Sequence, residues 1–122
     1  MSWPIMTYSQ FDVVVVPFPF TDKNANKRRP ALVLSDRAAF NESIGHSVMA
    51  MITTASHSTW PLDIRITDLG PAGLKVPSII RMKLFTIDNE LVREKIGELS
   101  QGDQESVQTA LSKLIRLPLE AG

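Results

Sequence analysis

Short apolar runs separated by turn-forming residues make up the first 77 residues of the chain. Proline, glycine, asparagine and aspartate recur between the runs, and no run approaches the length that a membrane-spanning helix needs. Several runs are β-branched, and one alternates apolar and polar residues with the period of a strand. The pattern predicts strands at 13–18, 30–35, 47–54, 62–67, 78–82 and 85–87, whereas 91–99 fits either a short strand or a helix.

The apolar period changes near the C-terminus. Four apolar residues there are spaced to lie on one face of a helix: Val107, Leu111, Leu114 and Ile115. Residues 100–103 are similar to a capping box, with aspartate in place of glutamate, and Pro118 is expected to end the helix. Strands in series followed by one amphipathic helix predict a mainly-β fold, a small barrel or sandwich. The helix must then cover either the barrel or a partner chain.

The length of 122 residues and the apolar share of 43% predict one domain with a real core. Absence of cysteine excludes disulfides, thiolate metal sites and cysteine nucleophiles. The sequence also lacks a glycine-rich phosphate loop and a histidine pair at ligand spacing, so we expect neither a metal nor a nucleotide cofactor. Residues 1–10 do not resemble a secretory signal, which makes a cytoplasmic location the default expectation.

Charge is unevenly distributed, although thirteen Lys and Arg balance thirteen Asp and Glu. Residues 23–37 hold five bases and one acid, residues 65–83 four bases and one acid, and residues 88–105 two bases and six acids. A neutral chain with basic stretches can bind a polyanion locally. A scatter of solvated surface charges explains the same pattern, and the sequence does not decide between the two.

The first segment with candidate functional residues is 17–30, PFPFTDKNANKRRP, in which a strand end meets a polar loop at 21–27. Lys27, Arg28 and Arg29 stand at the exit of this loop. Arg29 precedes Pro30, which favours an extended backbone and a rigid support for its guanidinium. Guanidinium groups match phosphate oxygens. The alternative is a solvated loop with three exposed bases.

Two further segments carry candidate residues. The segment 52–61, ITTASHSTWP, combines His57 and Trp60 with five hydroxyl side chains: Thr53, Thr54, Ser56, Ser58 and Thr59. It could donate hydrogen bonds to phosphate and offer Trp60 for stacking, or it could be a plain turn with Trp60 in the core. For Trp60 we expect burial, as for most tryptophans. Strand periodicity places Arg81 and Lys83 on one face of the strand at 78–82.

Taken together, three stretches resemble the MazF/PemK family of toxin endoribonucleases: VVVVPFPFTDKNANKRRPALVLS, MITTASHSTWPLDI and PSIIRMKLFTID. The resemblance extends over residues 11–116. It implies an SH3-like barrel with a C-terminal helix that works as a homodimer. It also implies metal-independent cleavage of single-stranded RNA through the 2′-OH, and an antitoxin with a disordered, acidic segment that silences the enzyme.

The resemblance also implies site residues. An arginine of the Arg-Pro step and a threonine after the third strand carry catalysis in the family, and these fall on Arg29 and Thr53, or on Thr54 if the register slips by one. Further candidates, expected to bind substrate, come from the three segments: Asp22, Lys27, Arg28, Thr54, Ser56, His57 and Arg81. Whether His57 takes part in catalysis is open. The chain departs from the family at Phe11, where a glycine is usual.

Two other functions compete with RNA cleavage. The CcdB toxins share the fold class but bind DNA gyrase, and a non-catalytic barrel could bind only a partner peptide. The Arg-Pro and threonine segments favour the nuclease. Cleavage of RNA in the absence of gyrase distinguishes the nuclease from a gyrase-binding toxin. A non-catalytic binding module predicts that Arg29→Ala leaves the cellular effects of the protein unchanged, which distinguishes it from the nuclease.

Overall fold

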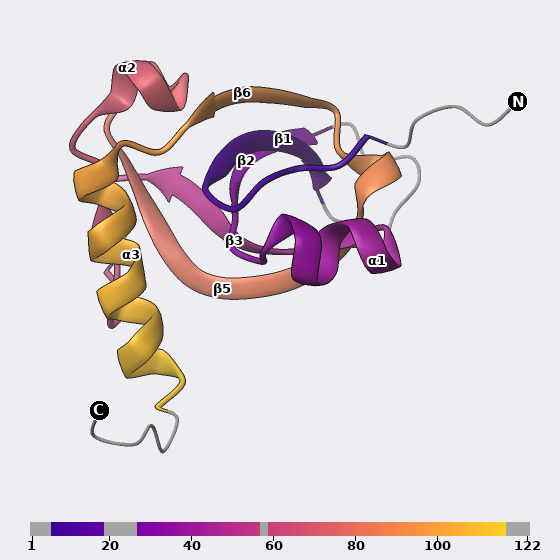
Figure 1. Cartoon of the computed structure of the whole chain (residues 1–122). Helices are drawn as coiled ribbons and strands as arrows, with labels where there is room; N and C mark the ends of the chain where they lie inside the picture. The colour runs from indigo at the N-terminus through magenta and orange to yellow at the C-terminus, as the bar shows by residue number, and fades with distance from the viewer. Residues whose placement is uncertain (1–5, 19–26, 57–58, 117–122) are drawn as a thin grey trace, which may run out of the picture.

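A curled antiparallel sheet of six strands forms the body of the protein (Figure 1). The computed structural model describes residues 6–18, 27–56 and 59–116. The sheet order is β4-β5-β3-β2-β1-β6. Its strands are β1 (Asp12–Phe18), β2 (Lys27–Val33), β3 (His46–Thr54), β4 (Ile64–Arg65), β5 (Ser78–Asp88) and β6 (Glu94–Glu98). The expected mainly-β barrel with a C-terminal helix is confirmed.

Each face of the sheet packs its own apolar cluster, because alternate residues of a strand point to opposite sides. One cluster includes Leu32, Ile52 and Ile80, and it is closed by Val107 and Ala110 of the C-terminal helix α3 (Gln101–Leu114). The other cluster includes Val14, Val16, Ala31, Val33 and Met49. Both faces of the central strands are therefore buried over most of their length, which explains the nearly continuous apolar run of β1.

The break expected between 82 and 85 is a bulge inside one strand. Ala50 of β3 pairs with Leu84, but the next residue, Met51, pairs with Arg81. Two residues of β5, Met82 and Lys83, are thus left without a partner in β3. Extra residues in one strand bend it, and β5 curves strongly around the barrel in Figure 1.

The N-cap of α3 is confirmed, since the hydroxyl of Ser100 accepts a hydrogen bond from the backbone N–H of Asp103. The carboxylate of Asp103, expected to complete a capping box, accepts hydrogen bonds from Thr67 and Asp68 instead. The predicted apolar face is only partly buried. Val107 is fully buried and Leu111 half-buried, but Leu114 and Ile115 are 39% and 54% exposed. The reason is visible in Figure 1, where the C-terminal half of α3 extends past the sheet.

The sequence patterns did not predict several short helical elements. A π-helical turn at Arg37–Asn41 continues into α1 (Glu42–Ile44), and α2 (Leu69–Ala72) lies between β4 and β5 in the chain. The ambiguous stretch 91–99 is resolved as the end of a 3₁₀ turn, Asn89–Leu91, followed by β6. Within the described ranges, no helix is long and apolar enough to cross a membrane.

Candidate functional site

Arg29 of β2 and Thr53 of β3 lie on neighbouring strands and line one cavity. The pairing of β2 with β3 ends at Ala31 and Met51, and Arg29 and Thr53 each lie two residues beyond that pair, on the same face of the sheet. The two residues named as catalytic candidates therefore lie just beyond the paired part of their strands, and a shared cavity brings them together.

The row that contains them continues across the sheet. Thr53 pairs with Ile79 of β5, and Ile79 in turn pairs with Arg65 of β4. Cross-strand partners share a face, so Thr53, Ile79 and Arg65 form one line of side chains over three strands. Arg29 lies on the same face of β2, and we call these four residues the arginine row. It lies on the same face as Ala31, beyond the apolar cluster that this residue joins.

Arg29 differs from the two bases that precede it. Lys27 and Arg28 are exposed, whereas Arg29 is half-buried. Its guanidinium carbon lies 5.4 Å from the centroid of the Phe18 ring, within the range of a cation–π contact. Phe18 itself belongs to β1 and pairs with Lys27. The sheet and the aromatic ring therefore hold Arg29 in place, as its position before Pro30 predicts.

A cavity of about 150 Å³ touches both Arg29 and Thr53. The other residues that line it are Pro30, Ile52, Thr54, Leu74, Val76 and Ser78. Strand alternation directs Pro30, Ile52 and Thr54 away from the face of the arginine row. Thr53 thus shares a face with Arg29 and Thr54 does not, which favours Thr53 as its partner.

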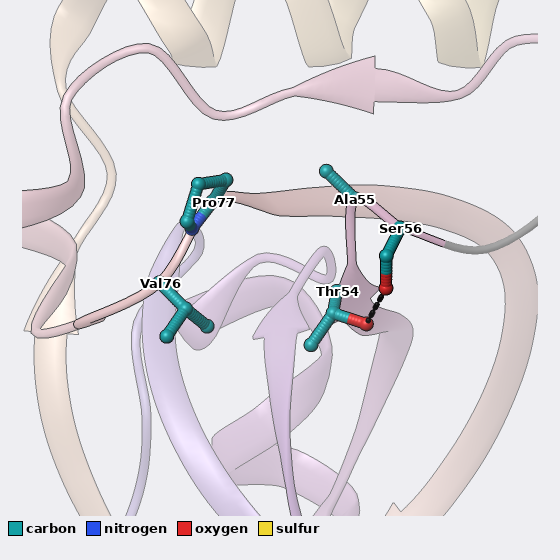
Figure 2. Close-up of a pocket in the computed structure, with 5 residues that line it drawn as sticks. All are labelled: Thr54, Ala55, Ser56, Val76 and Pro77. Carbon is teal, nitrogen blue, oxygen red and sulfur yellow. Dashed lines mark hydrogen bonds between the residues drawn. The ribbon is translucent and has the colours of Figure 1, made fainter.

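Thr54 and Ser56 belong instead to an adjoining hollow of about 310 Å³ (Figure 2). Their hydroxyl oxygens are 3.2 Å apart and hydrogen-bonded to each other. Val76 and Pro77 form the apolar wall across from them, with Ala55 beside them. Thr54 and Val76 line both hollows, so the two are contiguous. The candidate hydroxyls are therefore divided between the two faces of the sheet.

Arg81 is already engaged by a carboxylate. Its Nε and Nη2 donate to Oδ1 and Oδ2 of Asp63 at 3.2 and 2.9 Å, and both side chains are 11% exposed. The hydrogen bond from Arg81 holds the pKa of Asp63 below its usual value against the opposing effect of burial, and the Trp60 N–H adds to the lowering. A direct contact of Arg81 with phosphate would have to compete with this ion pair.

Trp60 is not in the core, so the expectation of burial is wrong. It is 42% exposed, and its ring lies 5.0 Å from the guanidinium carbon of Arg81. The cause is the shortness of β4, which begins only at Ile64. The residues before it turn outside the sheet, and the side chain of Asp63 accepts a hydrogen bond from the Trp60 N–H at 2.8 Å.

Two candidates, Asp22 and His57, lie outside the described residues, as does most of the 21–27 loop. Among the residues that the structure describes, no three His, Asp or Glu side chains gather as a metal site would require. Arg65 was not singled out from the sequence. The alternation of 62–67 indicated that Asp63 and Arg65 share a face, but only the pairing of β4 with β5 brings Arg65 into line with Thr53.

The family model for PemK-like, MazF-like toxins of type II toxin–antitoxin systems matches residues 9–115. No curated protein sequence gives a significant match. Similar solved structures include a mycobacterial endoribonuclease in complex with its cognate antitoxin, with 17% identity, a TM-score of 0.71 and coverage of 93% of this chain and 97% of that one. MazF from Deinococcus radiodurans has 22% identity and a TM-score of 0.69, with 92% and 99% covered.

The Mycobacterium tuberculosis toxin MazF-mt6 has 19% identity and a TM-score of 0.68, with 88% of this chain and 99% of that chain covered. These structures share the fold of this protein over nearly the whole length of both partners. The family model, which spans most of the 122 residues, carries the assignment. The chain belongs to the PemK-like, MazF-like toxins of type II toxin–antitoxin systems.

Proposed function

We propose that this toxin is an endoribonuclease that cleaves single-stranded RNA with the 2′-OH of the substrate as nucleophile and without a metal. The observation that carries the proposal is the cavity that Arg29 and Thr53 both line, where they stand on neighbouring strands. A guanidinium and a hydroxyl together supply donors for the oxygens of one phosphate. The RNA brings its own nucleophile, so the chain needs no cysteine or activated serine.

In the proposed reaction the 2′-hydroxyl gives its proton to a general base while its oxygen attacks phosphorus, and the bond from phosphorus to the 5′-oxygen breaks. The upstream fragment then ends in a 2′,3′-cyclic phosphate, and the 5′-oxygen leaves as a hydroxyl after it gains a proton. Arg29 holds the phosphate and stabilises the charge that develops on it, since its position against Phe18 is fixed before substrate arrives. Thr53 donates a hydrogen bond to the same group.

Proton transfer needs other groups as well, because a guanidinium is too weak an acid to exchange protons readily at neutral pH. His57 is the candidate with a suitable ordinary pKa. A proton-transfer role for His57 predicts that cleavage by the His57→Ala variant loses one limb of the pH profile. A role in ordering the loop predicts a lower rate with an unchanged profile.

We further propose that the toxin acts in the cytoplasm as a homodimer and is silenced by an antitoxin with an acidic segment. Similar folds have been solved as a mycobacterial endoribonuclease with its cognate antitoxin and as MazE-MazF from Deinococcus radiodurans. The exposed bases Lys27 and Arg28 beside Arg29 suit such a segment. Sedimentation at micromolar concentration tests the dimer, and a stable monomer would contradict it.

The decisive experiment incubates the protein with a long single-stranded RNA in EDTA and maps the ends of the fragments. The proposal predicts cleavage at a short recurring sequence, with cyclic phosphate at the upstream end. An RNA with one 2′-deoxy residue at the mapped position should resist. Efficient cleavage of that analogue would exclude the 2′-OH mechanism, and intact RNA in both samples would exclude the nuclease.

A further inference from the structure

An exposed tryptophan is fixed in position beside the arginine row. The 42% exposed Trp60 lies with its ring 5.0 Å from the guanidinium carbon of Arg81, so one side of the indole is occupied by a cation. Large aromatic side chains are usually buried, and an exposed one held by a specific contact has a surface available for a partner.

The support beneath this tryptophan is a network of hydrogen bonds. The carboxylate of Asp63 accepts from Nε and Nη2 of Arg81 and from the backbone N–H of Trp60. The N–H of Asp63 donates in return to the carbonyl oxygen of Trp60. Leu62, inside this turn, has a φ of 68°, a left-handed conformation that costs a branched residue free energy. The turn is thus held in one conformation by several independent contacts.

The arginine row places Trp60 near the proposed reaction centre. Arg81 pairs with Met51, two residues before Thr53 on β3, and therefore lies on the same face as Thr53. Diagonal neighbours across two strands have side chains about 7–8 Å apart. The indole above Arg81 is consequently within reach of a nucleotide next to one bound at Arg29 and Thr53.

Arg65 adds an uncommitted cation at the far end of the same row. It is exposed, and its guanidinium makes no hydrogen bond or ion pair with any other residue that the structure describes. It pairs with Ile79, which separates it from Thr53 by a single strand. Arg29 and Arg65 are three strands apart, roughly 14 Å at the usual strand spacing. A ligand with a single phosphate bound at Arg29 would not reach Arg65, but a chain of nucleotides would.

We infer that Trp60 and Arg65 form a second nucleotide subsite, in which the indole stacks on a base and the guanidinium binds a backbone phosphate adjacent to the scissile one. Exposed aromatic rings combined with cations in a groove are the elements by which proteins bind single-stranded nucleic acids. The inference rests on the proposed function, because it takes RNA as the ligand. Arg81 and Asp63 are positioning residues in this account, since they act on the RNA only through Trp60.

The test uses fluorescence and binding rather than cleavage. In a Trp3→Phe background Trp60 is the only tryptophan of the chain. A fully 2′-O-methylated RNA oligonucleotide of mixed sequence, which has no free 2′-OH, serves as the probe. We expect it to quench the fluorescence of Trp60 and, in anisotropy titrations, to bind Trp60→Leu about 10-fold or more weakly, while Trp60→Phe retains most of the affinity.

Arg65→Ala should weaken binding and lower the slope of log affinity against log salt by about 0.7, the value for one phosphate contact with a single strand. Arg37→Ala is the matched control, because Arg37 is also an exposed arginine but lies past the opposite end of β2. This control should leave both affinity and slope unchanged.

The subsite would be overturned if the RNA probe left the fluorescence of Trp60 unchanged and bound Trp60→Leu and Arg65→Ala as tightly as the wild type. This would hold even if Arg29→Ala abolished cleavage and so upheld the proposed function. Quenching by a polyglutamate peptide but not by the RNA probe would also overturn it, in favour of a peptide-binding surface. Binding and quenching in a protein that leaves unmodified RNA intact would support the subsite and reject the nuclease.

Discussion

Asp103 on the first turn of α3 binds Thr67, 36 residues earlier in the chain, through both the backbone and the side chain of the threonine. The Thr67 hydroxyl donates to Oδ1 at 2.8 Å, and the Thr67 N–H lies 3.2 and 3.1 Å from Oδ1 and Oδ2. The N–H of Asp68 donates to Oδ2 at 3.2 Å. A single buried carboxylate therefore ties the helix to the segment that follows β4.

Asp103→Asn is expected to lower the free energy of unfolding by about 1–3 kcal/mol, because an amide nitrogen replaces one acceptor and leaves a buried N–H without a partner. Urea denaturation at neutral pH measures the change. Asp68→Asn is the control, since the exposed Asp68 side chain makes no capping hydrogen bond. An equal loss in both variants would contradict the assignment.

Acid should weaken the protein through the same contact. Burial tends to raise the pKa of Asp103, but the hydrogen bonds from the Thr67 hydroxyl and from the Thr67 and Asp68 N–H groups outweigh it, so the pKa is lowered from 3.8. A lowered pKa means that the stabilisation is complete above 3.8 and is lost as the pH falls through the folded-state pKa. Below pH 4 the wild type should therefore lose stability more steeply than Asp103→Asn. Parallel curves would contradict this.

Phe11 has a φ of 73°, although it is not glycine, and it is buried. Its conformation matches the glycine that is usual in the family. Two opposing effects follow: a left-handed residue costs about 1–2 kcal/mol, and the lost packing of a buried Phe costs about 3–5 kcal/mol. Phe11→Gly should therefore be less stable than the wild type but about 1 kcal/mol more stable than Phe11→Ala. Equal stability of the two variants in urea denaturation would show that the backbone is unstrained.

The backbone of α2 lies directly against β6. A Cβ on Gly97 would overlap the carbonyl oxygen of Pro71 and the backbone of Ala72. Gly97→Ala is expected to cost about 1–3 kcal/mol through this overlap. Gly102→Ala, on the first turn of α3, meets nothing and should stabilise the protein by about 0.5–1 kcal/mol. Thermal unfolding of both variants tests the pair, and a neutral Gly97→Ala would place α2 farther from β6.

The strands with strong β-branched patterns could be predicted from the sequence, as could the capped helix. The alternating run 62–67 is a strand only at Ile64–Arg65, because the residues before Ile64 turn outside the sheet. The strand over Pro30 is a partial exception: it was expected at 30–35 but spans Lys27–Val33, because pairing with β1 extends it back through Arg29. The short turns near α1 and α2 could not be predicted, since tertiary contacts rather than local propensity hold segments of three to five residues.

The sequence predicted which residue types belong to the candidate site, but it did not predict how they are arranged in space. The Arg-Pro step indicated a rigid Arg29, and the structure holds it against Phe18. The outward position of Trp60 and the place of Arg65 depend on which strands pair, and β4 pairs with a strand that begins 13 residues after it ends. Hydrophobic periodicity carries no information on such pairing. The catalytic and binding roles of these residues stay predictions.

The central claim is that Arg29 and Thr53 act together on one phosphate. A double-mutant cycle on kcat/KM for RNA cleavage tests it, with Arg29→Ala, Thr53→Ala and the double variant, and Arg37→Ala as the control. Each single variant should lose ~10²-fold or more, the scale for removing one transition-state donor, and the double variant should lose much less than the product of the two. Wild-type cleavage by Arg29→Ala, or fully multiplicative losses, would contradict the account.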